Sequence, residues 1–151
     1  MEIKKIFIVG AGTMGNGIAQ VAATSGYQVT LMDVVSTQLE RARVGIGKSV
    51  EKLFGKGVLS ETQRDAAMGI IYASSFDGIG EADLVVEAAT ENPEIKLKIF
   101  RDIDSGACPE AILASNTSSI SITKIAAVTK RPEKVIGMHF MNPVPLMKLV
   151  E

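Results

Sequence analysis

The chain has 151 residues, and its 16 lysines and arginines nearly balance 17 acidic residues. Such a balance gives no basic field, so the composition argues against a nucleic-acid partner. The single cysteine, Cys108, excludes an internal disulfide and a metal cage built from cysteines, and we expect it to be a small buried side chain in a reducing compartment. No apolar run approaches the roughly 18–20 residues of a membrane span, and Ile6–Val9 is too short for a secretory signal. We therefore expect a cytoplasmic protein without a membrane partner.

The first predicted elements are a strand, a helix and a second strand. The apolar run over residues 3–9 ends in glycines, which is typical of a buried parallel strand. A helix is expected over 14–25, with apolar residues at helical spacing and a stop at Gly26. Residues 28–32 form the next apolar run, and Asp33 follows it directly. This order is that of an α/β protein.

A long helix is expected next, with Ser36 as its N-cap and Gly55 marking its end. Its predicted apolar face consists of Leu39, Ala42, Ile46, Val50, Leu53 and Phe54. Ser60 and Gln63 have the spacing of a capping box, which predicts the start of another helix. A third strand is expected over 70–73.

The second half of the chain repeats this alternation. Asn92 followed by Pro93 predicts a helix start, because Asn caps helices and Pro suits the first helical position. The buried side of that helix is expected to consist of Ile95, Ile99, Phe100 and Ile103. A further helix is expected over 121–128. Strands are expected over 83–89, 111–114 and 134–138, with a seventh beginning at 147–150.

Alternating strands and helices predict an α/β fold of the doubly wound Rossmann type, with a mostly parallel sheet and helices on both faces. In such sheets, ligands bind beyond the carboxyl ends of the strands. The polar clusters of the sequence follow predicted strands, so we expect them to gather at that edge: Gly10–Gly15, Asp33, Thr90–Asn92, Ser115–Ser118 and His139.

The first of these clusters, Gly10-Ala11-Gly12-Thr13-Met14-Gly15, has the spacing of a dinucleotide-binding loop. It follows a predicted strand, opens a predicted helix and precedes an acid at the end of the next strand. Gly10 would allow the tight turn, Gly12 the close approach of a pyrophosphate, and Gly15 the packing of helix on strand. The amides of Thr13 and Met14 would lie at the helix N-terminus, where phosphates bind.

Asp33 is the acid at the end of the second predicted strand. Its carboxylate would accept hydrogen bonds from the adenosine ribose hydroxyls and repel a 2′-phosphate, which favours NAD over NADP. Val34 and Val35 follow it, so no arginine stands ready for a 2′-phosphate. The alternative is that Asp33 caps the next turn.

The single histidine, His139, follows a predicted strand and is the candidate catalytic group. A histidine can take the proton of a hydroxyl group near neutral pH while hydride leaves the same carbon. The alternative is a core histidine that is satisfied by the backbone. No cluster with the spacing of metal ligands accompanies it.

Four segments together resemble the short-chain L-3-hydroxyacyl-CoA dehydrogenase family, which includes bacterial 3-hydroxybutyryl-CoA dehydrogenases. They are Gly10–Gly15, Leu84–Ala88, Ser115–Ser119 and His139–Glu151. The resemblance covers essentially the whole chain. The last two segments are specific, whereas the glycine loop is shared by many dehydrogenases.

The resemblance implies a role for several residues. His139 would be the catalytic base, and Glu151 would orient its imidazole. Ser118 would contact both the substrate oxygen and the cofactor, and Asn142 would help to place substrate and nicotinamide. Glu91 and Lys96 match positions that border the cofactor. The alternatives are local: Ser118 as a helix cap, Asn142 as a turn residue, and Lys96 as a solvated helix charge.

The resemblance also implies that Ser49 and Lys56 contact coenzyme A. Lys48, Lys52 and Lys56 are spaced to share one helix face, which could hold phosphates or remain a solvated surface.

Members of the family have a second, mostly helical domain that completes the substrate cleft and forms the homodimer. This chain stops at Glu151. We therefore expect residues 1–151 to be the NAD-binding domain alone, inactive without its second half. Two other interpretations remain: a hydroxyacid dehydrogenase of the L-gulonate or lambda-crystallin type, and a dinucleotide-binding module without catalysis.

Overall fold

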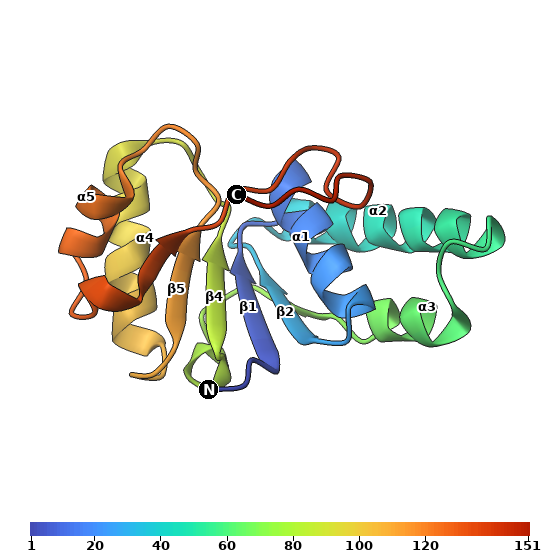
Figure 1. Cartoon of the computed structure of the whole chain (residues 1–151), viewed down its shortest axis with the longest axis horizontal. Helices are drawn as coiled ribbons and strands as arrows, with labels where there is room; N and C mark the ends of the chain where they lie inside the picture. The colour runs from blue at the N-terminus through green and yellow to red at the C-terminus, as the bar shows by residue number, and fades with distance from the viewer.

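A computed structural model describes all 151 residues, Met1–Glu151. Six parallel strands form one sheet in the order β3-β2-β1-β4-β5-β6. Figure 1 shows α1, α2 and α3 beside one half of the sheet and α4 and α5 beside the other. The strands are β1 (Lys5–Val9), β2 (Gln28–Met32), β3 (Ile71–Ala73), β4 (Leu84–Glu87), β5 (Ile112–Ser115) and β6 (Val135–Gly137). The helices are α1 (Thr13–Thr24), α2 (Ser36–Gly55), α3 (Glu61–Met68), α4 (Pro93–Gly106) and α5 (Ile122–Ala127), with 3-10 turns at Ile79–Glu81 and Pro132–Lys134. The predicted doubly wound α/β fold is confirmed.

The sheet separates two apolar cores, because alternate residues of each strand point to opposite faces. Ile6 and Ile8 of β1 belong to the core beneath α1 and α2. Phe7 and Val9 belong to the core beneath α4 and α5. Strands that are buried on both faces explain why the sequence shows short continuous apolar runs.

Register across the sheet aligns the carboxyl ends of its strands. Val9 pairs with Met32 on one side and with Glu87 on the other, Glu87 pairs with Ser115, and Ser115 pairs with Gly137. Met32 also pairs with Ala73, the last residue of β3, so all six strands end at this row. The segments that follow these strands therefore emerge at one edge of the sheet, as the sequence predicts.

Most predicted helix boundaries are confirmed by the side chains that fix them. Ser60 and Gln63 form a reciprocal capping box. Asn92 accepts a hydrogen bond from the backbone amide of Ile95 at 3.1 Å, and Pro93 takes the first position of α4. Gly26 ends α1 with a φ of 98°, a conformation that glycine adopts without strain.

Two predictions about helices are wrong. Ser36 is the first residue of α2 and not its cap; Val35 holds the N-cap position without a side-chain hydrogen bond. Ile95 points outward with 52% exposure, and Lys96 takes the inward position together with Phe100 and Ile103. Residues at i, i+4 and i+7 share a helix face, so the apolar pattern of α4 is completed by a lysine whose charge is satisfied inside the protein.

The predicted seventh strand is also absent. Residues 147–150 form only an isolated antiparallel bridge between Phe140 and Val150. A parallel strand would need a crossover connection of a dozen or more residues after β6, and this segment folds straight back. Cys108 is half-buried rather than fully buried. No helix combines the length and apolar character needed to cross a membrane.

Candidate active site

The glycine loop between β1 and α1 has the geometry that its spacing predicts. Gly10 has a φ of 105°, and a Cβ there would lie 2.7 Å from the carbonyl oxygen of Ala88. A Cβ at Gly15 would lie 1.6 Å from the carbonyl oxygen of Gly10. A Cβ at Gly12 would meet nothing within 4 Å. Two glycines thus let the chain pack tightly, and the third leaves open space above the backbone.

The N-terminus of α1 is free to receive an anion. Gly12 occupies the N-cap position, and no side chain caps the helix. The first amides, from Thr13 and Met14 onward, lack an intrahelical partner, and the helix dipole adds positive potential. Open space at Gly12 and uncapped amides fit a pyrophosphate, so the loop can hold a dinucleotide.

Asp33 lies just beyond the carboxyl end of β2 and holds the glycine loop in place. One of its carboxylate oxygens accepts from the amide of Ala11 at 2.9 Å, and the other from the amide of Val35 at 2.9 Å. The carboxylate therefore closes the following turn and also faces the loop. A carboxylate oxygen has the capacity to accept two hydrogen bonds, so these single contacts leave acceptor capacity for ribose hydroxyls.

His139 and Glu151 are brought together by the last twelve residues of the chain, which fold back toward α1 (Figure 1). Their backbones exchange two hydrogen bonds, of 2.8 Å and 2.9 Å. The His139 Nδ1 lies 3.3 Å from a carboxylate oxygen of Glu151. A proton on Nδ1 that faces the carboxylate leaves the Nε2 lone pair free to accept a proton.

The segment 140–151, here called the C-terminal strap, is fixed by two buried residues and a side-chain amide. Phe140 and Val144 belong to the core under α1. A Cβ at Gly17 of α1 would lie 2.7 Å from the Val144 Cβ, so only glycine permits this contact. The amide of Phe140 donates to the side-chain oxygen of Asn116 at 2.9 Å. Asn116 lies in the predicted polar cluster Ser115–Ser118 but was assigned no role from the sequence, and Gly17 was not singled out.

Ser118 lies exposed in the loop after β5, and Glu91 anchors the loop around it. The Glu91 carboxylate accepts from the Thr117 hydroxyl at 2.8 Å and from the Ser119 hydroxyl at 2.7 Å. Partial burial raises the pKa of Glu91, but these two hydrogen bonds and the positive charge of Lys96 outweigh burial and hold the pKa below its ordinary value. Ser118 therefore lies in a loop whose conformation is stabilised by the Glu91 carboxylate.

Among the predicted site residues, Lys96 has surroundings that differ most from those expected. Its side chain is 1% exposed, and its ammonium lies 2.5 Å from Glu87, 3.4 Å from the Ser115 hydroxyl and 3.8 Å from Glu91. The solvated-charge alternative is therefore wrong. Glu87 belongs to the segment Leu84–Ala88 but was assigned no role from the sequence, although an acid at the end of a buried apolar run was a usable signal.

The remaining predicted residues form no hydrogen bond with Lys96 or its partners. Asn142 is exposed at the start of the C-terminal strap, before a cis peptide to Pro143. The Ser49 hydroxyl accepts from the buried side chain of Gln20 at 2.9 Å. Lys56 follows the end of α2, a helix that extends away from the sheet (Figure 1). Twenty helical residues span about 30 Å, so Lys56 is distant from the start of α2.

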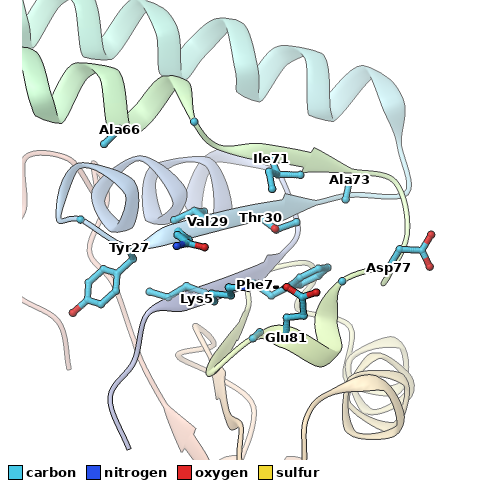
Figure 2. A pocket seen from close by; sticks show the side chains of 16 residues that line it. Lys5, Phe7, Tyr27, Val29, Thr30, Ala66, Ile71, Ala73, Asp77 and Glu81 are labelled. Carbon is cyan, nitrogen blue, oxygen red and sulfur yellow. Dashed lines mark hydrogen bonds and ion pairs between the residues drawn. The ribbon is translucent and has the colours of Figure 1, made fainter.

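A cavity of about 630 Å³ lies elsewhere, against β1, β2 and β3. Figure 2 shows side chains such as Lys5, Phe7, Thr30 and Ile71 around it. Glu81 closes one side and contacts Lys5 at 2.7 Å (Figure 2). No predicted site residue lines this cavity. The candidate site is instead the open edge at the carboxyl ends of the strands.

The fold, the glycine loop and Asp33 together define a dinucleotide-binding domain. The family model described as 3-hydroxyacyl-CoA dehydrogenase, NAD binding domain, matches residues 5–151. The chain therefore belongs to the NAD-binding domain family of the 3-hydroxyacyl-CoA dehydrogenases, and its cofactor is NAD.

Similar proteins support this assignment. A 3-hydroxybutyryl-CoA dehydrogenase of Bradyrhizobium diazoefficiens is 49% identical over 150 residues, which are 99% of this chain and 51% of the relative. A probable 3-hydroxybutyryl-CoA dehydrogenase of Bacillus subtilis is 47% identical, with 100% of this chain and 53% of the relative covered. The crystal structure of (S)-3-hydroxybutyryl-CoA dehydrogenase from Ralstonia eutropha has a TM-score of 0.94 at 46% identity, with 99% of this chain and 53% of that one covered. The chain thus spans about half the length of these relatives.

Proposed function

We propose that the protein is an oxidoreductase that reversibly oxidises (S)-3-hydroxyacyl-CoA, with 3-hydroxybutyryl-CoA as its substrate, to the 3-ketoacyl thioester. The contact between His139 and Glu151 carries this proposal, because it supplies an oriented base at the dinucleotide-binding edge. The names of the relatives support the substrate class and favour it over a sugar acid.

The base in this reaction is His139. Its Nε2 takes the proton of the substrate hydroxyl, and the imidazolium that forms is stabilised by the carboxylate of Glu151. When NAD is bound, it accepts the hydride that leaves the same carbon. In the reverse direction, the imidazolium returns its proton to the oxygen as the carbonyl is reduced.

Three further residues are proposed to place the reacting groups. The Ser118 hydroxyl donates to the substrate oxygen and borders the cofactor, and Asn142 orients the nicotinamide. Glu91 borders the cofactor and holds the loop of Ser118 through Thr117 and Ser119. The exposure of Ser118 and Asn142 at the strand edge supports these roles, since both side chains can be reached by a ligand.

Coenzyme A is proposed to contact Ser49 and Lys56. Lys48, Lys52 and Lys56 are all exposed, which supports a cationic surface along the outer part of α2. Phosphates bind such a surface through charge-assisted hydrogen bonds. The long pantetheine arm of coenzyme A would then reach from α2 toward the strand edge.

We further propose that residues 1–151 act as the NAD-binding domain of a longer cytoplasmic protein. The length of the relatives supports this proposal, since this chain covers 51–53% of the first two. Exposed apolar side chains on the C-terminal strap also support it: Leu146, Met147, Leu149 and Val150. The second half would complete the substrate cleft and form a homodimer.

The test is oxidation of (S)-3-hydroxybutyryl-CoA by the full-length protein, followed as NADH formation. Replacing His139 by Ala is expected to lower kcat by about 10²–10⁴-fold, the range for loss of a general base. Replacing exposed Lys98 of α4 by Ala serves as the control and leaves kcat unchanged. Near-normal turnover by His139→Ala would refute the assignment of the base. Turnover of L-gulonate in place of the thioester would refute the substrate class.

A further inference from the structure

Glu87 is a fully buried carboxylate that the proposed reaction does not use. It is the last residue of β4 and has 0% exposure. One oxygen accepts from the Lys96 ammonium at 2.5 Å and from the Ser115 hydroxyl at 2.7 Å. The other accepts from the amide of Ala89 at 2.8 Å and that of Thr90 at 3.4 Å. A buried charge is tolerated only when it is paired and hydrogen-bonded in this way.

The position of Glu87 in the sheet gives this arrangement its significance. β1 and β4 are neighbours at the centre of the sheet, where the strand order reverses. Dinucleotides bind across the crevice at such a switch point. Glu87 pairs directly with Val9, the residue that precedes the glycine loop. The carboxylate therefore lies directly beneath the expected path of the cofactor.

Glu87 also joins the two loops that carry the nicotinamide side of the site. Its contacts with Ala89 and Thr90 fix the loop after β4, which leads to Glu91. Its contact with Ser115 fixes the start of the loop that carries Ser118. Lys96 connects both loops, because its ammonium also lies 3.8 Å from Glu91.

We propose that Glu87 is a positioning residue for the nicotinamide half of NAD. It holds Lys96 and the loops of Glu91 and Ser118 in the conformation that receives the cofactor. The proposal adds to the proposed function and rests on it only for the roles of Glu91 and Ser118. Because Glu87 is fully buried, it acts through these neighbours and not by contact.

The protein contains a second buried ion pair that provides a matched control. Asp104 contacts Arg131 at 2.7 Å, with side chains 7% and 10% exposed. Arg131 also donates to the backbone oxygens of Ala107 and Cys108 at the far end of α4. This pair ties α4 to the start of β5 and has no contact with the loops at the strand edge. Its loss should affect stability alone.

The first experiment compares Glu87→Gln with Asp104→Asn by NADH titration and thermal unfolding. Both variants remove the nearest anion of a buried cation, so both are expected to lower Tm. Only Glu87→Gln is expected to weaken NADH binding, by about tenfold, in the folded protein. The chain contains no tryptophan, so NADH emission is measured without interference.

A second variant separates stability from positioning. Glu87→Gln combined with Lys96→Met replaces the ion pair by neutral side chains of similar size, which is often neutral or stabilising for the fold. We expect Tm to recover while the NADH affinity stays low, because Glu91 has lost its cation. Recovery of both properties, or unchanged affinity in Glu87→Gln, would overturn the proposal. Neither measurement uses an acyl-CoA, so failure of the proposed reaction would be recognised separately.

Discussion

Substitution of Gly17 in α1 should destabilise the protein through a contact with the C-terminal strap that does not involve the cofactor. A Cβ at this position would lie 2.7 Å from the Val144 Cβ, 3.0 Å from its Cγ2 and 3.5 Å from the Pro145 Cδ. Ordinary van der Waals contacts of a Cβ begin at 3.4 Å. The change Gly17→Ala therefore requires α1 and the C-terminal strap to move apart by several tenths of an ångström. Val144 is 4% exposed, so its side chain cannot turn toward solvent without leaving the core.

The magnitude follows from two opposing effects. Alanine in a helix interior is favoured over glycine by about 0.5–1 kcal/mol. Overpacking a well-filled core costs about 1–3 kcal/mol. Gly47 of α2 supplies the control, because a Cβ there would meet nothing within 4 Å. Gly47→Ala should raise the free energy of unfolding. The free energy of unfolding of Gly17→Ala should be about 1–3 kcal/mol lower than that of Gly47→Ala.

Two measurements check this prediction. Urea unfolding gives the difference in stability between the Gly17→Ala and Gly47→Ala proteins. Proton NMR then reports on the strap, since His139 is the single histidine and its ring resonances are free of overlap from others. We expect these resonances to move in Gly17→Ala and to stay in place in Gly47→Ala. Equal stability of the two variants would show that the strap is not held against α1 as described.

Two further predictions concern charged residues of the site. Replacing Asp33 by Asn removes the charge that repels a 2′-phosphate, so the preference for NADH over NADPH should fall by about tenfold. Parallel titrations with the two cofactors measure this preference. An unchanged preference would contradict the role of Asp33 in cofactor selection. Glu91 has a lowered pKa in the folded protein, so its charge stabilises the fold above the ordinary pKa of 4.5 and ceases to do so as pH falls through the lowered value. The Tm of the wild-type protein should therefore exceed that of Glu91→Gln at pH 7, and this difference in Tm should disappear on acidification. A difference in Tm that persists below the lowered pKa of Glu91 would contradict the stabilisation by its hydrogen-bonded carboxylate.

Local sequence determined the elements and the cofactor loop, because the forces that set them act over a few residues. Apolar runs and helical spacing fixed the order of strands and helices. The conformational freedom of Gly10 and the capping by Asn92 depend on neighbours only a few residues away. Parallel pairing then brought Gly10, Asp33 and His139 to one edge, which the alternation alone was enough to predict.

Tertiary structure alone decided which side chains act on one another. Lys96 lies on the buried face of α4 with Phe100 and Ile103, but a lysine gives no signal of burial in the sequence. Its burial became visible only when β4 placed Glu87 opposite it. The strap meets His139 because Val144 finds space against Gly17, a contact between segments more than a hundred residues apart. Such contacts depend on the shape of the folded core, and close packing leaves one arrangement that fills it. The periodicity of the sequence predicts which face of a helix or strand each side chain lies on, but it does not predict which residue that side chain contacts.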